Sequence, residues 1–231
     1  MKNLFYLLLF ISLPSFSQIK GGEISYTVSL KFDEGFSKDK NLKDYYKKAQ
    51  EGAKKLILTL KFNEKESIFY ANDLMEDEEI EWAKSFTETD DIYYVQQNSD
   101  NKLLQTEIFQ GKYVINYSEK RTWKLENESK LIDGYLCYKA TSELVVKNNV
   151  GVFKYPIVAW YCPSIPLNFG PKGYSGLPGL ILELQERNTL FGVQKINVAE
   201  KNVIIKKPND GKIVTQEEFD KITSKIPTLI E

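Results

Sequence analysis

The sequence predicts a mainly β protein with a minor helical part, built as a single curved antiparallel sheet or an incomplete β-barrel. One packed helix is expected near residues 41–54 and a short C-terminal helix near 215–226. Three observations predict this class. Apolar and polar side chains alternate over short segments, turn-forming residues separate these segments, and aromatic residues, which favour strands, make up 13% of the chain.

Residues 1–17 have the layout of a secretory signal peptide. Lys2 is their only charged residue, an eight-residue apolar run follows, and small residues occupy Ser15 and Ser17. We expect cleavage after Ser17, which leaves 18–231 as a single β domain in the periplasm or outside the cell. The apolar run is shorter than the roughly 20 residues that span a bilayer. No second apolar run is long enough either, so no integral membrane segment is expected in the mature chain.

The elements of the first third follow from local periodicity. Apolar residues alternate with polar ones over 23–32, which predicts a half-buried strand. Leu42, Tyr45, Tyr46, Ala49 and Ala53 then recur at helical spacing, capped by Asp39 or Asn41. The alternating residues 56–62 and 67–71 predict a hairpin that turns at 63–66. Residues 73–91 are strongly acidic and lack the EF-hand spacing, so a solvated loop is expected there.

The remaining elements continue the all-β pattern. Strands are expected at 92–96, 103–109 and 112–117, and the meander is expected to continue through 122–125. Near the C-terminus, Thr215 to Glu218 has the spacing of a capping box. This pattern predicts the start of the C-terminal helix.

A long hairpin is predicted in the centre of the chain. Segments 136–147 and 152–162 flank a turn-rich tetrapeptide at 148–151. If Lys147 faces Val152, one face of the hairpin becomes nearly all apolar. The pattern therefore sets the register of the two strands.

The same register places Cys137 opposite Cys162, and these are the two cysteines of the chain. An even pair in an oxidising compartment predicts a disulfide, although opposed Cβ atoms lie slightly farther apart than a disulfide prefers. Pro156 removes a ladder donor and allows a bulge that would separate the sulfurs. Two buried free thiols are the alternative.

The composition excludes several function classes. The chain has no histidine, which removes Ser-His-Asp and Cys-His catalysis and histidine ligation of metals. Its 31 basic and 32 acidic residues give no electrostatic reason to bind nucleic acid. No catalytic, cofactor-binding or metal-binding residue is identified and no cofactor is expected, so an enzymatic activity is disfavoured but left open.

One proline- and glycine-rich segment has its own pattern. It contains Trp160, Pro166, Gly170 and Pro171 and ends in Gly176, Leu177, Pro178, Gly179, Leu180 and Ile181. Pro178 and Gly179 suit the centre of a type II turn, and the following residues alternate as a strand. The expected role is a rigid connection in which glycine lets two backbones approach, with a backbone anion nest as the alternative.

These residues resemble the GLPGLI family, which is named after this motif, and the stretch from Gly134 to Ala140 also resembles its pattern. The resemblance implies an exported protein of Gram-negative bacteria, often encoded beside outer-membrane transport components. It implies no established activity.

Three functions remain open at this point. The first is a non-catalytic binding or carrier module of the cell envelope for an apolar ligand or a peptide, for which an internal apolar cavity would be evidence. The second is a structural or assembly partner of an outer-membrane transport machine, which an exposed sheet edge with an apolar patch would favour. The third is a hydrolase that uses two carboxylates about 5–9.5 Å apart.

Overall fold

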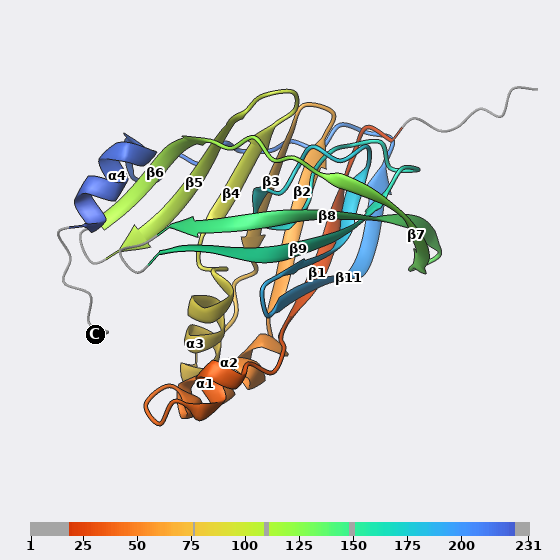
Figure 1. Cartoon of the computed structure of the whole chain (residues 1–231). Helices are drawn as coiled ribbons and strands as arrows, with labels where there is room; N and C mark the ends of the chain where they lie inside the picture. Colours follow the sequence, from red (N-terminus) through yellow and green to blue (C-terminus); the bar gives the residue numbers. More distant parts are fainter. Residues whose placement is uncertain (1–18, 76, 109–110, 148–150, 225–231) are drawn as a thin grey trace, which may run out of the picture.

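The computed structural model describes residues 19–75, 77–108, 111–147 and 151–224, and the expected signal peptide at 1–17 lies outside these residues (Figure 1). The strands are β1 (Gly21–Leu30), β2 (Ile57–Asn63), β3 (Glu66–Ala71), β4 (Ile92–Gln96), β5 (Asn101–Ile108), β6 (Gly111–Ser118), β7 (Lys124–Ile132), β8 (Tyr135–Lys147), β9 (Val152–Cys162), β10 (Leu180–Glu186), β11 (Thr189–Ala199) and β12 (Lys212–Thr215). The helices are α1 (Glu34–Lys38), α2 (Lys43–Ala53), α3 (Glu78–Thr87) and α4 (Gln216–Thr223), with a 3-10 turn η1 (Pro171–Gly173).

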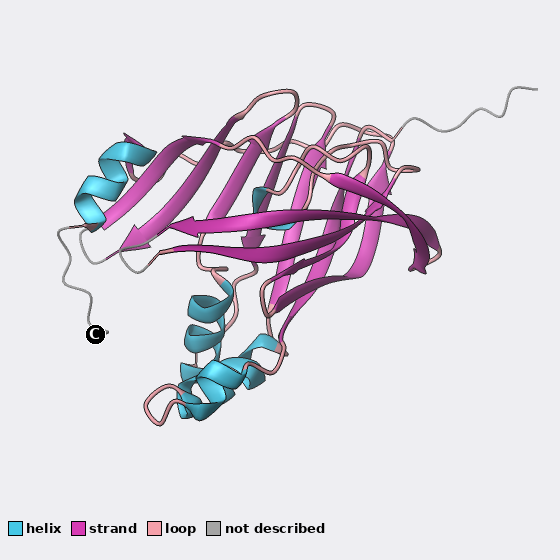
Figure 2. Ribbon diagram, viewed as in Figure 1, coloured by secondary structure: helices cyan, strands magenta, loops and turns pink. Residues whose placement is uncertain are grey.

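Within the described residues, the strands form one 12-stranded sheet in the order β12-β6-β5-β4-β3-β2-β1-β11-β10-β9-β8-β7. The expected fold class is confirmed: the protein is mainly β, and its single sheet is curved but not closed into a barrel (Figure 2). The expectation of a purely antiparallel sheet is corrected at one edge, where β12 pairs with β6 in parallel.

The expected meander does not continue from β6 into β7. These two strands lie near opposite ends of the sheet, and residues 119–123 carry the chain between them. The curvature brings the far end of the sheet back, so that β8 and β9 pass across the face of β3–β6 (Figure 1). The main core fills the space between these two layers, with side chains from β1–β4 packed against those of β8–β11.

The helix expected near residues 41–54 is present as α2, which buries Tyr46, Ala49 and Ala53. The C-terminal helix α4 is also confirmed, and its capping box is formed by Thr215 and Glu218. Both helices were predictable because each has a clear apolar face beside polar residues.

The expectation of a solvated loop at 73–91 was wrong, because α3 occupies its centre. Asp77 caps this helix by accepting a hydrogen bond from the N–H of Ile80. The acidic residues at its start are paired with lysines on and just after α2: Lys48 lies 2.6 Å from Glu78, and Lys55, two residues past the end of α2, lies 2.7 Å from Asp77. Opposite charges on a neighbouring helix therefore offset the repulsion that the sequence indicated.

The predicted hairpin register is confirmed by β8 and β9. Lys147 faces Val152, and Tyr138 faces Tyr161, with no bulge between them. Pro156 is tolerated because it faces Glu143, whose carbonyl points away from β9 toward Arg121. On its other side, the pairing with β10 begins one residue later, at Ile157.

The expected disulfide is not formed: Cys137 and Cys162 are both free and fully buried. The Cys162 thiol lies 2.9 Å from the Ser164 hydroxyl, and a hydrogen bond between the two thiols lowers the pKa of Cys162. Facing positions in an antiparallel pair hold their Cβ atoms at about 4.5–5.5 Å, beyond the mean of about 3.8 Å in a disulfide. The structure therefore contains the alternative, two buried free thiols.

Candidate functional site

The loop at 163–179 between β9 and β10 reaches the concave side of the sheet, where its turn η1 contacts β3 and β4. Two side chains from other elements bind its backbone. Lys102 of β5 donates a hydrogen bond to the carbonyl of Gly173 at 2.9 Å, and the indole N–H of Trp123 donates to the carbonyl of Ser175 at 2.9 Å.

The motif that follows packs tightly but does not form the expected type II turn. The N–H of Gly179 donates to the carbonyl of Leu177, a γ-turn spacing centred on Pro178. A Cβ on Gly179 would lie 2.3 Å from the carbonyl oxygen of Cys162. Glycine is therefore required at position 179 because two backbone segments approach closely there. This agrees with the expectation that glycine in this motif lets two backbones approach.

The other motif residues differ in burial. Leu177, Leu180 and Ile181 are buried in the main core. Gly170 and Pro171 are buried at the start of η1, Trp160 is half-buried in β9, and Gly176, Pro178 and Pro166 are exposed. None of these residues carries chemistry by itself, but the loop they hold positions Lys172 and Tyr174.

Lys172 is a buried cation that pairs with two carboxylates. Its ammonium lies 2.6 Å from the carboxylate of Glu88 and 3.1 Å from that of Glu186. Glu186 also accepts a hydrogen bond from the Tyr174 hydroxyl at 2.5 Å. The backbone of Lys172 has a φ of 51°, a left-handed conformation that is uncommon for residues other than glycine. The ion pairs and the packed loop hold it there.

Arg121, on the connection between β6 and β7, lies beside this arrangement. Its guanidinium pairs with Glu119, donates to the main-chain carbonyl of Glu143 at 3.1 Å, and stacks 4.5 Å from the ring centre of Tyr174. Glu119 also pairs with Lys102 at 2.9 Å. Among the described residues, the Nε–H of Arg121 is buried without a hydrogen-bond partner. We refer to Glu88, Lys102, Glu119, Arg121, Lys172 and Glu186 as the ion-pair cluster.

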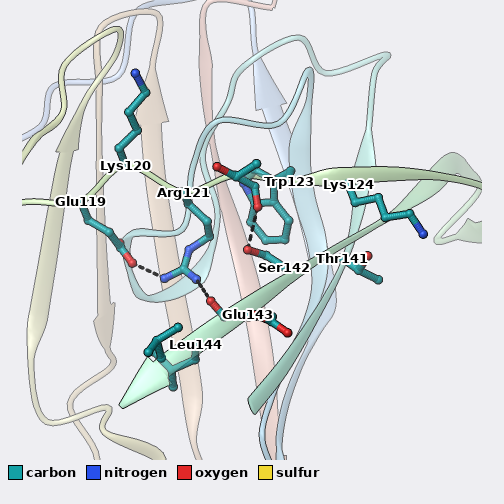
Figure 3. A pocket seen from close by; sticks show the side chains of 11 residues that line it. Glu119, Lys120, Arg121, Trp123, Lys124, Thr141, Ser142, Glu143 and Leu144 are labelled. Atoms are coloured by element: carbon teal, nitrogen blue, oxygen red, sulfur yellow. Dashed lines mark hydrogen bonds and ion pairs between the residues drawn. The ribbon is translucent and has the colours of Figure 1, made fainter. Parts of the chain in front are cut away.

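Two cavities adjoin the cluster. The outer groove, of about 660 Å³, lies between residues 119–124 and residues 141–145 of β8 (Figure 3). The inner pocket, of about 410 Å³, is lined by cluster members, by three tyrosines and by two leucines, among other residues: Glu88, Tyr93, Leu104, Tyr117, Glu119, Arg121, Leu144, Lys172, Tyr174 and Glu186. Glu119, Arg121 and Leu144 line both cavities, so the two are neighbours.

The cluster controls the charges of its members. Burial raises the pKa of Glu119, but the adjacent Lys102 and Arg121 outweigh this and hold it below the usual carboxyl value. Burial lowers the pKa of Lys172, but Glu186 and Glu88 raise it above the usual value. These groups are therefore charged at neutral pH and firmly paired. Asp91 differs, because burial raises the pKa of its carboxyl group.

Sequence reasoning missed every member of this cluster. One signal was present: the chain has only two arginines, Arg121 and Arg187, among 31 basic residues. Both stack on tyrosine rings, Arg121 on Tyr174 and Arg187 on Tyr155 at 4.4 Å. In a chain that otherwise uses lysine, arginine marks positions where a planar, stacking cation is needed.

The described residues contain no group of three or more cysteine and acidic side chains placed to hold a metal ion. None of the helices in the same residues is long and apolar enough to cross a membrane.

Comparisons with known proteins show what this chain resembles. A family model described as "Protein of unknown function (Porph_ging)" matches residues 151–183, which include the loop and its motif. No curated protein matches the chain. Two solved structures of PNGF-II, in P21 and C2 space groups, match with TM-scores of 0.52 and 0.51. Each is 13% identical and covers 89% of this chain but 33% of the PNGF-II chain. The chain therefore spans about a third of that protein and shares its fold over that part.

Proposed function

We propose that this protein is a non-catalytic binding module of the cell envelope that accepts an extended peptide along β8. The supporting observation is an open strand edge beside the outer groove. The pairing of β7 with β8 ends where Lys124 faces Thr141, whereas β8 continues to Lys147 with β9 on its other side. In the described residues, no strand pairs with this last part of β8 on the β7 side.

The orientation of the free edge follows from one hydrogen bond. The carbonyl of Glu143 points toward Arg121 and hence away from β9 (Figure 3). In an antiparallel strand, the N–H and C=O of one residue point to the same side, and the direction alternates along the strand. The main-chain groups of Val145 therefore also face the groove. The Glu143 carbonyl already accepts from Arg121, so an added strand would pair first with the main-chain groups of Val145, as in β-strand addition.

The unpartnered Nε–H of Arg121 also supports a ligand at this position. A buried donor on a charged group is unfavourable when it lacks an acceptor. A peptide carbonyl entering the groove supplies an acceptor after a small movement of the side chain. The groove is also partly apolar at its edge, where Val145 is 54% exposed.

A carrier for an apolar ligand and a carboxylate hydrolase have less support, and an assembly partner coincides with this proposal. The described cavities are lined by charged side chains, which does not favour a carrier for a purely apolar ligand. Glu88 and Glu186 bind the same lysine, and the lowered pKa of Glu88 does not suit a general acid. An outer-membrane assembly partner would use the same strand edge, so it is a special case in which the peptide belongs to a larger protein.

The proposed location outside the cytoplasm rests on the sequence. The signal-peptide pattern of residues 1–17 and the resemblance to the GLPGLI family both support export.

The experiment is a titration of ¹⁵N-labelled residues 18–231 with the capped peptide acetyl-Ser-Val-Thr-Lys-Thr-Val-Ser-amide. We expect amide shifts at Glu143 and Val145 to exceed those at Ser142 and Leu144, whose N–H groups face β9. Val145→Pro removes one edge donor and should weaken binding about 5- to 10-fold, from the net value of one hydrogen bond. Val145→Thr keeps the donor and is the matched control.

Melting curves show whether either variant is unfolded. Binding that shifts residues elsewhere, or that is equal in the folded proline and threonine variants, would overturn the proposed edge. Absence of binding by peptides with lysine, norleucine or glutamate at the centre would overturn the function.

A further inference from the structure

The inner pocket lies where a strand added to β8 would place a side chain. Side chains of a strand alternate between the two faces of its sheet. Leu144 marks the concave face of β8, because it packs against the main core and lines the inner pocket as well as the outer groove. Every second residue of a peptide paired with β8 would share this face. One of them would therefore point toward the inner pocket.

The charges at the pocket are arranged by depth. The cations are covered: the side chains of Lys172 and Arg121 are 7% and 10% exposed. Two of the three carboxylates are more open: Glu88 is 60% exposed and Glu119 is 35% exposed, whereas Glu186 is 9% exposed. Although both signs are present, an arriving side chain meets the carboxylates first. The most exposed charged groups of the pocket lining are therefore carboxylates, although each is paired with a cation behind it.

The tyrosines of the pocket experience the same sign of potential. Burial raises the pKa of Tyr93, and Asp91 and Glu88 raise it further. Burial also raises the pKa of Tyr117, with Glu119 adding to the effect and Arg121 opposing it. For Tyr174, burial and Glu186 act in the same direction. Burial is the largest cause for all three rings and disfavours any charge, so only the smaller contribution of the negative neighbours favours a positive charge at the same place.

Aromatic rings complete the pocket. Arg121 already stacks on Tyr174, so one ring is in use as a platform for a cation. Tyr93 and Tyr117 are two further rings in the lining. A cation close to an aromatic face gains about 0.5–2 kcal/mol, with the larger values at desolvated sites. The pocket thus combines exposed carboxylates with ring faces, both of which bind organic cations.

From these observations we infer that the inner pocket binds a basic side chain, lysine or arginine, of the peptide held on β8. This inference rests on the proposed function and specifies its ligand. Glu88 and Glu119 would face the cation, and Tyr117 would stack against it. The aliphatic stem would contact Leu104 and Leu144, which line the same cavity.

The test compares three capped peptides, acetyl-Ser-Val-Thr-Xaa-Thr-Val-Ser-amide, with lysine, norleucine or glutamate at Xaa. Calorimetry at low ionic strength should show the lysine peptide binding about 5- to 30-fold tighter than the norleucine peptide, and the glutamate peptide binding weakest. The preference for lysine over norleucine should shrink in high salt because partly exposed charges are screened.

Two variant pairs locate the preference. Glu88→Gln should reduce the lysine preference, whereas Glu81→Gln removes the same charge from an exposed site on α3 that does not line the pocket and should leave it unchanged. Tyr117→Leu should reduce the preference, and Tyr117→Phe, which keeps the ring, should retain it. Binding of the norleucine peptide should persist in all four variants, which shows that they remain folded.

The outcomes separate the two proposals. If all three peptides bind with the edge shifts at Glu143 and Val145 but with equal affinity, the basic-side-chain inference is wrong and the peptide-binding function stands. A preference for the glutamate peptide would also overturn the inference. If the lysine preference is unchanged in both Glu88→Gln and Tyr117→Leu, the basic side chain binds outside the inner pocket and the inference is wrong.

Discussion

Replacement of Gly179 by alanine should be among the most damaging single-methyl additions to this fold. The added Cβ would lie 2.3 Å and 2.6 Å from the carbonyl oxygen and carbon of Cys162 and 2.9 Å from the nitrogen of Pro163. All three are backbone atoms, so no side chain can rotate away. The strand β10 would have to move from β9, and overpacking of this kind costs about 1–3 kcal/mol, occasionally more. We expect about 3 kcal/mol, at the top of that range.

Two other glycines provide a graded comparison. Gly192 has nothing within 4 Å of an added Cβ, so alanine there should leave stability nearly unchanged. Gly176 has a φ of +91° but no neighbour closer than 3.7 Å, so alanine should cost about 1 kcal/mol through backbone strain alone.

Thermal and urea denaturation of the three variants measures this order. For a chain of this length about 1 kcal/mol corresponds to roughly 2–4 °C in Tm, so Gly179→Ala should melt about 6–12 °C below the wild type. A Gly179→Ala protein that melts within 2 °C of Gly192→Ala would refute the close approach as the reason for glycine at this position.

Three further predictions concern charge and processing. Asp91→Asn should raise Tm at pH 7, because burial raises the pKa of this carboxyl group and its ionisation therefore opposes folding; the gain should vanish near pH 3, where the wild-type group is protonated. Glu119→Gln should lower Tm at pH 7, because Lys102 and Arg121 hold the pKa of the Glu119 carboxyl group below its usual value. This loss of Tm should disappear as the pH falls through that lowered pKa. A loss of Tm that stays constant across a pH series would contradict the lowered pKa. N-terminal sequencing of the protein from its native envelope should begin at Gln18, and retention of Met1 would contradict export by cleavage.

Local features of this protein were predictable from the sequence. The β8–β9 register followed from the apolar face and the turn between the strands, because a shift of one residue would have placed that face in water. Helix α2 followed from its spacing. Helix α3 was missed although Ile80, Ala83 and Thr87 lie at helical intervals, because the density of acidic residues was interpreted without the lysines of α2.

The ion-pair cluster was not predictable in the same way. Glu88, Lys102, Arg121, Lys172 and Glu186 come from five segments that are distant in the sequence. Only the curvature of the sheet and the inward loop bring them together, and neither leaves a periodic pattern. The loop itself could be identified as a rigid connection, but the charged residue at position 172 was indistinguishable from the other lysines of the chain.

The pairing of β1 with β11 has a consequence for how the chain acquires this structure. Strands β1–β6 form one block of neighbours, β7–β11 form another, and the contact between β1 and β11 is the seam that joins them. During synthesis, β1 is complete long before residues 189–199 exist, so one edge of the first block stays open while the second is made. Such non-local pairing slows folding, and an open edge with buried-type residues such as Ile24 and Tyr26 invites association with other chains. Closing of this seam should therefore be a slow step of folding, and refolding at high protein concentration should favour aggregation through the open edge of β1.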